Sequence, residues 1–331
     1  MRKIFAMSIV LCLGLSMFGC GQSPADSDDN GTSGSNGSQS SETSAVAEDG
    51  DITLGICLCS TTTEYWSSVA DGIHAQAGEL GVEVTLVAPS SETDVSGQVS
   101  MLEDMIASDV DAICCGPCDS TTVGSTLQNA IDAGIPVVIV DTDVTDIERN
   151  AFVGISQAEA AYMTKPYVEE ALGTGFKAAL IGGVQGHEAT TGRLEGFTNV
   201  CNDLDAEVIE TQYGDWTADR AMTITEAFLS KYDVGELDVI MCASDNTALG
   251  ASSAIKAAGR EDVKVVGFDG NPSACQEILD GSILCTVSQD GDAIGQAIVD
   301  TLYAYATGGT TDEYVLVDCI GIGPENAADY V

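Results

Sequence analysis

Residues 52–88, ITLGICLCSTTTEYWSSVADGIHAQAGELGVEVTLVA, decide the fold class. The run Ile52–Cys59 is short and almost entirely apolar, which predicts a strand buried on both faces. Tyr65–Leu80 places apolar residues on one helical face and ends before Gly81, which predicts an amphipathic helix. Val82–Ala88 is a second strand-like run, so the stretch predicts one strand–helix–strand unit.

The same alternation continues to the end of the chain. Amphipathic stretches such as Val95–Ala107 separate the further runs. These runs are Ala112–Gly116, Ile135–Asp141, Ala151–Ser156, Lys177–Gly182, Ala206–Gln212, Val239–Ala243, Val263–Asp269, Leu284–Gln289 and Tyr314–Cys319. So many strands need two sheets, and 331 residues suffice for two domains. We therefore predict an α/β fold of two doubly wound parallel-sheet lobes, with helices on both faces of each sheet.

The charge balance excludes several classes of function. The chain carries 11 Lys and Arg residues against 52 Asp and Glu residues, a formal net charge of −41. Nucleic acid is therefore excluded as a partner, because its phosphates are bound by Lys and Arg. Between Lys3 and Arg149 there is no Lys or Arg, which excludes a P-loop lysine from that stretch.

The first fifty residues predict export and a lipid anchor. Arg2 and Lys3 precede the apolar run Ile4–Phe18, which is too short to span a membrane, so residues 1–19 are typical of a signal peptide. Gly19-Cys20 resembles the lipobox of bacterial lipoproteins, which predicts lipidation of Cys20. Residues 21–50 predict a flexible acidic linker. An ordinary signal peptide cut near Ala25, or a buried apolar strand, is the alternative.

We accordingly expect the mature protein on the extracellular face of the cell membrane, lipid-anchored, or in the periplasm if the organism has an outer membrane. Ten cysteines remain after Cys20, mostly inside strand-like runs, and free thiols packed as small apolar groups are expected. A disulfide that involves Cys118 or Cys201 is an open alternative. No spacing matches a structural zinc site, and we expect neither metal nor cofactor.

The residues that follow the strand-like runs indicate a ligand site. In doubly wound sheets, ligands bind beyond the carboxyl ends of the strands. Aromatic and acidic residues gather there, without Lys or Arg: Tyr65, Trp66, Asp119, Asp141, Asp143, Tyr213, Trp216, Asp245, Asp269 and Asp290. Such a set suits a polyol, or an amine through charge pairing. Alternatively, each Asp caps the next helix, and Tyr65 with Trp66 plugs a first helical turn.

Five segments resemble ribose/galactose-type solute-binding proteins, in the order expected for that family. They are ITLGIC…TEYWSSVADGIHAQAGELGVEV, IPVVIVDTDV, SDNTALGASSAI, VVGFDGNPSACQEILDG and LCTVSQDGDAIGQAIV, within residues 51–320. The resemblance implies a type I periplasmic binding protein, whose two lobes are joined by three crossing segments. The first lobe would comprise residues 51–155 plus 290–314, and the second 156–289 plus 315–331. The hinge would pass near Ser156, Gln289 and Tyr314.

The resemblance also implies which residues contact the ligand. By position, Tyr65 and Trp66 correspond to the aromatic pair that packs on the sugar, and Trp216 to the aromatic residue of the second lobe. The full set implied is Tyr65, Trp66, Asp119, Asp141, Thr142, Ser156, Thr191, Trp216, Ser244, Asp269 and Gln289.

Four positions depart from the family pattern. Thr142 and Thr191 stand where sugar binders often carry Arg, and Gly116 and Ser244 stand where they carry Asn. The expected pocket is therefore poor in donors and rich in acceptors. We predict that it suits a larger sugar, a polyol, an amino sugar or an amine-bearing ligand better than ribose.

The resemblance implies a binding protein rather than an enzyme. A monomer would capture a small solute, most simply a sugar, between its lobes and deliver it to an ABC transporter permease in the membrane. A sensor that presents a sugar, amine or nucleoside to a chemoreceptor or kinase is the alternative. Neither a Gly-x-Gly-x-x-Gly turn after the first strand nor a Gly-x-Ser-x-Gly elbow occurs. A lac-repressor-type regulator would need an N-terminal DNA-binding helix-turn-helix in place of the signal.

Overall fold

A computed structural model describes residues 52–144 and 146–331, which lie in one compact unit. The predicted signal peptide, Cys20 and the linker lie outside the described residues. Of the helices described, none is long and apolar enough to cross a membrane.

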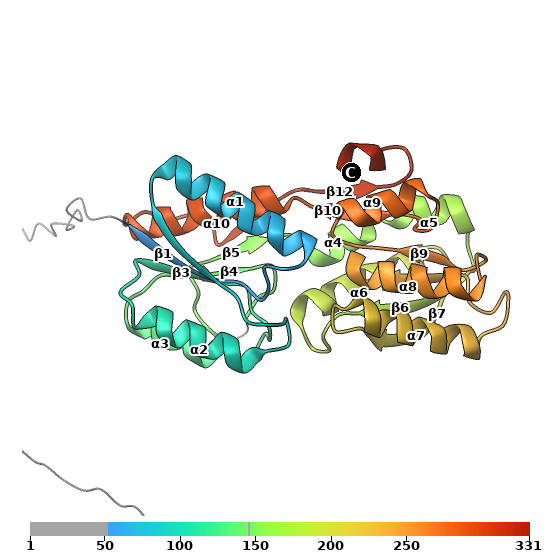
Figure 1. Ribbon diagram of the computed structural model, residues 1–331, viewed down its shortest axis with the longest axis horizontal. Coiled ribbons are helices and arrows are strands. Elements are labelled where there is room, and N and C mark those ends of the chain that lie inside the picture. Colours follow the sequence, from blue (N-terminus) through green and yellow to red (C-terminus); the bar gives the residue numbers. More distant parts are fainter. Residues whose placement is uncertain (1–51, 145) are drawn as a thin grey trace, which may run out of the picture. The chain divides into compact units, whose positions relative to one another are not determined.

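The first lobe is built on a six-stranded parallel sheet with the strand order β11-β5-β4-β3-β1-β2. Its strands are β1 (Thr53–Cys57), β2 (Glu83–Val87), β3 (Ala112–Cys115), β4 (Val137–Val140), β5 (Ala151–Gly154) and β11 (Tyr314–Leu316). Helices α1 (Glu64–Leu80) and α10 (Gly291–Ala306) cover one face, and α2 (Val95–Ile106) and α3 (Gly124–Asp132) cover the other (Figure 1). The strands β1, β3, β4 and β5 are almost wholly buried, as their continuous apolar runs predict.

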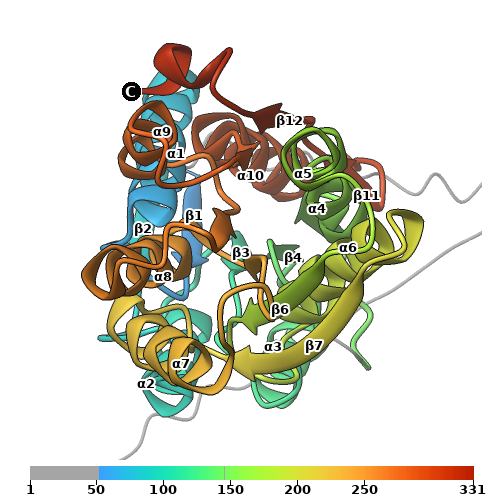
Figure 2. The same ribbon diagram turned by 90° about the vertical axis from the view of Figure 1, so that its right-hand side faces the viewer.

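The second lobe is built on a four-stranded parallel sheet with the order β7-β6-β8-β9. Its strands are β6 (Lys177–Gly182), β7 (Glu207–Tyr213), β8 (Val239–Cys242) and β9 (Lys264–Val266). One face carries α6 (Glu188–Asp203), against which α4 (Gln157–Tyr162) packs, and α5 (Lys165–Leu172) follows α4. The other face carries α7 (Ala218–Lys231) and α8 (Asp245–Ala258) (Figure 2). Helix α9 (Pro272–Leu279) packs beside α8.

Two further strands, β10 (Thr286–Gln289) and β12 (Cys319–Ile322), pair antiparallel with each other. Single parallel bridges, Val266 to Cys285 and Asp269 to Ser288, join the β10 segment to the chain around β9. The chain ends in a short 3₁₀ helix, Ala327–Tyr330, which packs on α9. These elements therefore extend the second lobe.

The chain passes between the lobes three times. The crossings lie at residues 155–156 between β5 and α4, at Asp290 between β10 and α10, and at residues 317–318 between β11 and β12. The single strand predicted over Tyr314–Cys319 is wrong, because the chain leaves the first sheet after Leu316 and pairs with β10 from Cys319. The third crossing therefore lies at residues 317–318, just beyond Tyr314, near which the family resemblance placed this part of the hinge.

Thiols form part of the apolar core. All ten cysteines of the described residues are free, and nine of them are buried. The prediction of free thiols is therefore confirmed, and no disulfide involves Cys118 or Cys201 within the part of the chain that the structure describes. Burial raises the pKa of Cys57, for example, to about 12, which keeps this thiol protonated at neutral pH.

Helices α1 and α10 pack so closely that a glycine is required at their crossing. A β-carbon at Gly72 would lie 2.3 Å from the carbonyl oxygen of Asp292. We expect Gly72→Ala to lower the free energy of unfolding by about 1–3 kcal/mol, because a backbone atom cannot move aside without shifting a helix. Urea denaturation followed by circular dichroism measures this change.

Gly78, on the same helix, is the matched control. A β-carbon there would meet nothing within 4 Å. We expect Gly78→Ala to raise the free energy of unfolding by about 0.5–1 kcal/mol, since alanine is the better helix former. Equal effects of the two substitutions would contradict the close helix crossing.

Candidate functional site

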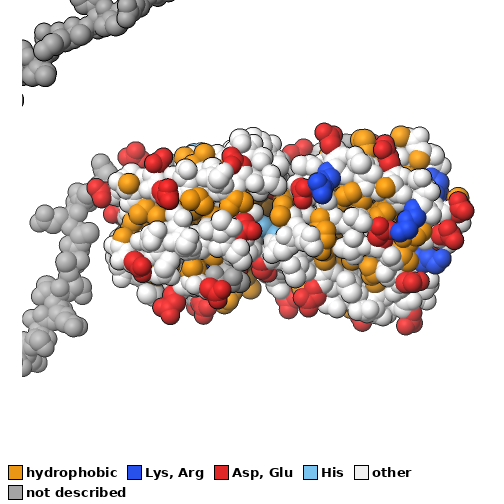
Figure 3. Space-filling model, turned by 90° about the horizontal axis from the view of Figure 1, so that it is seen from below, with side chains coloured by type: hydrophobic (Ala, Val, Ile, Leu, Met, Phe, Trp, Pro, Cys, Tyr) orange, Lys and Arg blue, Asp and Glu red, His pale blue; other side chains and the backbone are white. Residues whose placement is uncertain are grey.

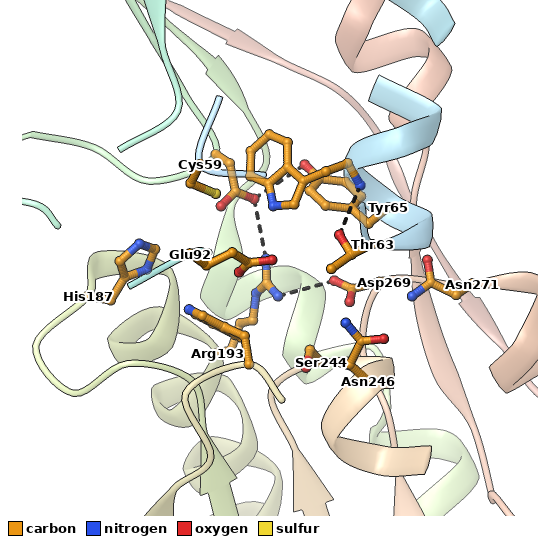
Figure 4. A pocket seen from close by; sticks show the side chains of 13 residues that line it. Cys59, Thr63, Tyr65, Glu92, His187, Arg193, Ser244, Asn246, Asp269 and Asn271 are labelled. Atoms are coloured by element: carbon orange, nitrogen blue, oxygen red, sulfur yellow. Dashed lines mark hydrogen bonds and ion pairs between the residues drawn. The ribbon is translucent and has the colours of Figure 1, made fainter. Parts of the chain in front are cut away.

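A small cavity, of about 40 Å³, lies where the carboxyl ends of the strands of the two lobes face each other (Figure 4). The first lobe contributes Cys59, Thr63, Tyr65, Trp66, Glu92 and Asp141. The second lobe contributes His187, Arg193, Trp216, Ser244, Asn246, Asp269 and Asn271.

Two aromatic residues of the cavity sit in the first turn of α1. Thr63 caps this helix, and its side chain accepts a hydrogen bond from the backbone of Trp66. The cap directs Tyr65 and Trp66 inward, where both are buried, and their ring centres lie 4.9 Å apart at an angle of 60°. The hydroxyl of Tyr65 donates to Asp141 Oδ1 at 3.3 Å.

A third aromatic residue, Trp216, reaches the cavity from the loop between β7 and α7. Its φ of 62° lies in the left-handed region, which is costly for a bulky side chain. A β-carbon at Gly183 would lie 2.1 Å from the Trp216 ring, so only glycine permits the ring to lie over that backbone. Strained backbone of this kind is concentrated at functional sites.

Arg193 projects from the second turn of α6 into the middle of the cavity wall and is 3% exposed. Its guanidinium donates to Asp141 Oδ1 at 3.3 Å and to Asp269 Oδ1 at 3.2 Å. It also donates to the carbonyl oxygen of Ala243 and to Gln157 Oε1, each at 2.8 Å. Arg193 therefore joins carboxylates that come from the two lobes.

Both carboxylates are held in unusual backbone conformations at strand ends. Asp141 follows β4 with a φ of 65°, and Asp269 follows β9 with a φ of 127°. Burial raises the pKa of Asp269 to about 6, although Arg193 opposes the rise. Gln289 Nε2 donates to Asp269 Oδ1 at 2.9 Å and fixes its orientation.

Glu92 enters the cavity from the loop between β2 and α2. Its side chain points toward the space beside the Arg193 guanidinium (Figure 4). Burial, and to a lesser extent the charges of Asp269 and Asp141, raises the pKa of Glu92 to about 8.

His187 bridges the two lobes at the start of α6. Its Nε2 lies 3.1 Å from the carbonyl oxygen of Pro117, and its Nδ1 lies 3.1 Å from the hydroxyl of Thr142. Because a carbonyl only accepts, Nε2 carries the proton and Nδ1 accepts from Thr142. Burial lowers the pKa of His187, which favours this neutral form. Although His187 stands at the start of α6, its side chain is buried and not on the surface.

With one exception, the described Lys and Arg residues lie in the second lobe. In the described first lobe Arg149 is the only Lys or Arg, and it pairs with Asp143 at 2.6 Å. Figure 3 shows Asp and Glu side chains over the whole face in view, whereas Lys and Arg appear only on the half formed by the second lobe. Arg193 is the only cation that lines the cavity.

Comparison with known proteins accounts for this architecture. The family model of the periplasmic binding protein domain matches residues 54–310. The chain belongs to this family. Periplasmic binding proteins of this kind bind substrates for transport, and the predicted α/β fold of two parallel-sheet lobes is confirmed.

Curated relatives of this periplasmic binding protein have similar lengths. The ribose import binding protein RbsB of Bacillus subtilis (strain 168) is 30% identical over 246 residues, which cover 74% of this chain and 79% of that protein. A D-ribose/D-allose-binding protein of Pseudomonas aeruginosa is 30% identical over 245 residues, covering 71% and 76%. The resemblance to ribose/galactose-type solute-binding proteins is confirmed.

Among solved structures, an ABC transporter solute binding protein from Bacillus halodurans C-125 with bound myo-inositol superposes with a TM-score of 0.79. The two sequences are 26% identical, and the match covers 86% of this chain and 98% of that one.

The structure brings six of the eleven predicted ligand residues of this periplasmic binding protein to the cavity: Tyr65, Trp66, Asp141, Trp216, Ser244 and Asp269. Ser244 also caps α8, where its hydroxyl accepts from the backbone of Thr247.

The other five predicted residues lie around the cavity without lining it. Asp119 closes a turn by accepting from the backbones of Thr121 and Thr122. Thr142 contacts His187, and Thr191 is exposed and donates to the carbonyl oxygen of His187. Ser156 lies in the first crossing, and Gln289 lies behind Asp269.

Sequence reasoning missed several lining residues, above all Arg193 and Glu92. Arg193 lies in the second turn of α6, beyond the residues that directly follow β6. A search limited to the residues at strand ends therefore does not find it. Glu92 lies in a loop without periodicity, and no signal in the sequence marks it. The expectation that the pocket lacks an arginine is therefore wrong.

Proposed function

We propose that this protein captures a small polyhydroxylated solute, a sugar or a cyclic polyol, between its lobes and delivers it to an ABC transporter permease. The observation that carries the proposal is a cavity in which Tyr65, Trp66 and Trp216 surround the carboxylates Asp141 and Asp269. Aromatic faces pack on the C–H face of a sugar ring, while carboxylates accept hydrogen bonds from its hydroxyls. The names of the relatives, which are ribose import and ribose/allose binding proteins, support the same class of ligand.

Binding would be coupled to lobe closure, without covalent chemistry. The three crossings are short, and contacts between the lobes surround the cavity. Glu64 accepts from the Ser273 hydroxyl at 2.8 Å, and Ser120 accepts from the Glu188 backbone at 3.1 Å. A ligand that bridges Asp141 and Asp269 would add to these contacts and stabilise the closed form, which the permease would recognise.

The location of the protein is part of the proposal. Cleavage after Gly19 and lipidation of Cys20 would tether a monomer to the outer face of the membrane, with residues 21–50 as a spacer. Mass spectrometry of the mature N-terminus tests this part directly.

The two tryptophans make binding directly observable. The chain contains only Trp66 and Trp216, and both line the cavity. We expect a bound sugar or polyol to change the intrinsic tryptophan fluorescence, since ring packing alters the surroundings of both indoles. A titration panel of pentoses, hexoses, inositols and their amino derivatives, with melting temperature as a second readout, tests the proposal.

Single-tryptophan variants show which lobe responds. Trp66→Phe and Trp216→Phe each leave one reporter on one lobe and keep an aromatic ring in place. We expect Trp216→Ala to weaken binding at least about 10-fold, because one stacking face is worth roughly 1–3 kcal/mol. A saturable change in melting temperature without any change in fluorescence would place the ligand outside this cavity.

A further inference from the structure

The cavity carries more negative charge than its single cation balances. Glu92, Asp141 and Asp269 contribute three carboxyl groups, and Arg193 contributes the only positive charge. Arg193 lies close to Asp141 and Asp269 and forms ion pairs with both. Glu92 is the carboxyl group that remains.

The donors of Arg193 are almost fully used within the protein. Of its five N–H groups, one binds Gln157, one binds Ala243, one binds Asp269 and one binds Asp141. A single N–H is left for a ligand. Arg193 therefore mainly links the two lobes through its ion pairs with Asp141 and Asp269. It has few N–H donors left for an anionic or acceptor-rich ligand.

Glu92 has no such partner. No hydrogen bond or ion pair reaches its carboxyl group from any residue that the structure describes, although it points into the cavity (Figure 4). The titratable and charged groups around the same space are Cys59, Tyr65, Asp141, His187, Arg193 and Asp269. Arg193 is already paired within the protein, and the other groups are neutral or acidic near pH 7. His187 is among the neutral ones, because burial lowers its pKa.

A second polar group in this region also lacks a donor. Gln289 is 5% exposed, and its Oε1 has no hydrogen-bond partner while its Nε2 is used by Asp269. Gln289 lines a groove that shares Tyr65, Asp269 and Asn271 with the cavity. An unpaired buried acceptor is costly, so a ligand that extends into this groove would gain from an N–H or O–H group that reaches Gln289 Oε1. The ring of Trp66 can additionally receive a cation, whereas the Arg193 guanidinium already lies over the Trp216 ring, 5.4 Å from its centre.

We propose that the ligand carries an ammonium group on a polyhydroxylated ring or chain, as in an amino sugar or amino polyol, and that Glu92 pairs with this group. The inference rests on the proposed function and narrows it to a ligand class. Asp141, Asp269 and the aromatic rings hold the hydroxylated part, and Glu92 provides the one cavity carboxyl group that has no partner among the described residues.

The pairing has a measurable proton signature. The pKa of Glu92 is raised to about 8, so its carboxyl group is mostly protonated at pH 7 in the free protein. An ammonium group beside it favours the ionised form. Binding of an amine at pH 7 should therefore release close to one proton, whereas binding of a neutral sugar should release none.

Isothermal titration calorimetry of the wild-type protein at pH 7, in buffers of different ionisation enthalpy, measures both affinity and proton release. The probes are matched pairs: D-glucosamine with D-glucose, D-galactosamine with D-galactose, and the N-acetyl derivative of each amine. We expect one amine to bind at least about 30-fold more tightly than its neutral counterparts, with proton release.

Glu92→Gln supplies the second arm of the test. It should weaken binding of the amine at least about 30-fold, more than it weakens any binding of the neutral sugar, and abolish proton release. Glu103→Gln makes the same side-chain substitution at an exposed position on α2, away from the cavity, and should alter neither the affinity for the amine nor the proton release. If Glu92→Gln folds poorly, proton release by the wild-type protein still decides the proposal.

The outcomes separate the inference from the proposed function. A neutral sugar that binds as tightly as its amine, without proton release, would overturn the inference and leave sugar capture intact. Tight binding of the amine that Glu92→Gln does not weaken would also overturn it. If no sugar, polyol or amino derivative binds, the proposed function itself fails.

Discussion

Replacing Arg193 with methionine should lower the free energy of unfolding by about 3–5 kcal/mol, the usual cost of removing one partner from a buried ion pair. Methionine is flexible and fills a similar volume, so the change removes mainly the charge and the donors. Asp141 and Asp269 would then remain in the closed cavity without a cation, and Gln157 Oε1 and the Ala243 carbonyl would lose their donor. Urea denaturation at pH 7, followed by far-ultraviolet circular dichroism, measures the loss.

Arg220→Met is the matched control for this change. Arg220 pairs with Asp215 at 3.0 Å, but its side chain is 58% exposed, so we expect a cost below about 1 kcal/mol. Lowering the pH to 5 should reduce the deficit of Arg193→Met, because protonation of Asp269, whose pKa burial raises to about 6, removes part of the uncompensated charge. If Arg193→Met loses little unfolding free energy, or loses the same amount at pH 7 and pH 5, the ion pairs of Arg193 do not stabilise the contact between the lobes.

The backbone of this fold could be predicted from sequence because most of its parallel strands are covered on both faces. Runs such as Ala112–Gly116 and Val239–Ala243 are apolar at every position, and turn residues separate them from amphipathic helices. The prediction failed at Tyr314–Cys319, where Val317 continues the apolar pattern through the third crossing. Burial pattern alone does not reveal that the chain changes from one sheet to another.

The cavity could be predicted only in part, because the local sequence does not show which side chains reach it from other elements. Strand ends identify residues such as Asp141 and Asp269, since topology brings these ends together. Arg193 reaches the same space from a helix, and its role depends on the length of its side chain and on the direction of α6. Asp119, in contrast, follows a strand but does not line the cavity. Its carboxylate accepts hydrogen bonds from the backbone N–H groups of Thr121 and Thr122 instead. Local sequence does not determine which partner a polar side chain meets.

The unliganded protein should lose stability as the pH rises from 5 to 8, and Glu92 should account for most of the loss. The folded-state pKa of Glu92, about 8, lies above its ordinary value of 4.5, so between these values the folded protein binds more protons than the unfolded chain. Stability therefore falls as pH rises through this window. Asp269, with a pKa raised to about 6, acts in the same direction at the lower end. His187, whose pKa burial lowers from its ordinary value of 6.5, acts in the opposite direction as the pH rises toward that value.

Glu92→Gln isolates the contribution of this one group. At pH 8 the variant should be more stable than the wild-type protein by roughly 2 kcal/mol, a figure reduced for the partial exposure of Glu92. At pH 5 the two proteins should unfold within about 1 kcal/mol of each other, since wild-type Glu92 is then protonated and neutral like glutamine. Urea denaturation of both proteins without ligand at pH 5, 6.5 and 8 measures the difference, with Glu103→Gln as the exposed control. A stability difference that does not grow with pH would mean that water, and not the cavity, surrounds the Glu92 carboxylate, because only a desolvated carboxyl group resists ionisation so strongly.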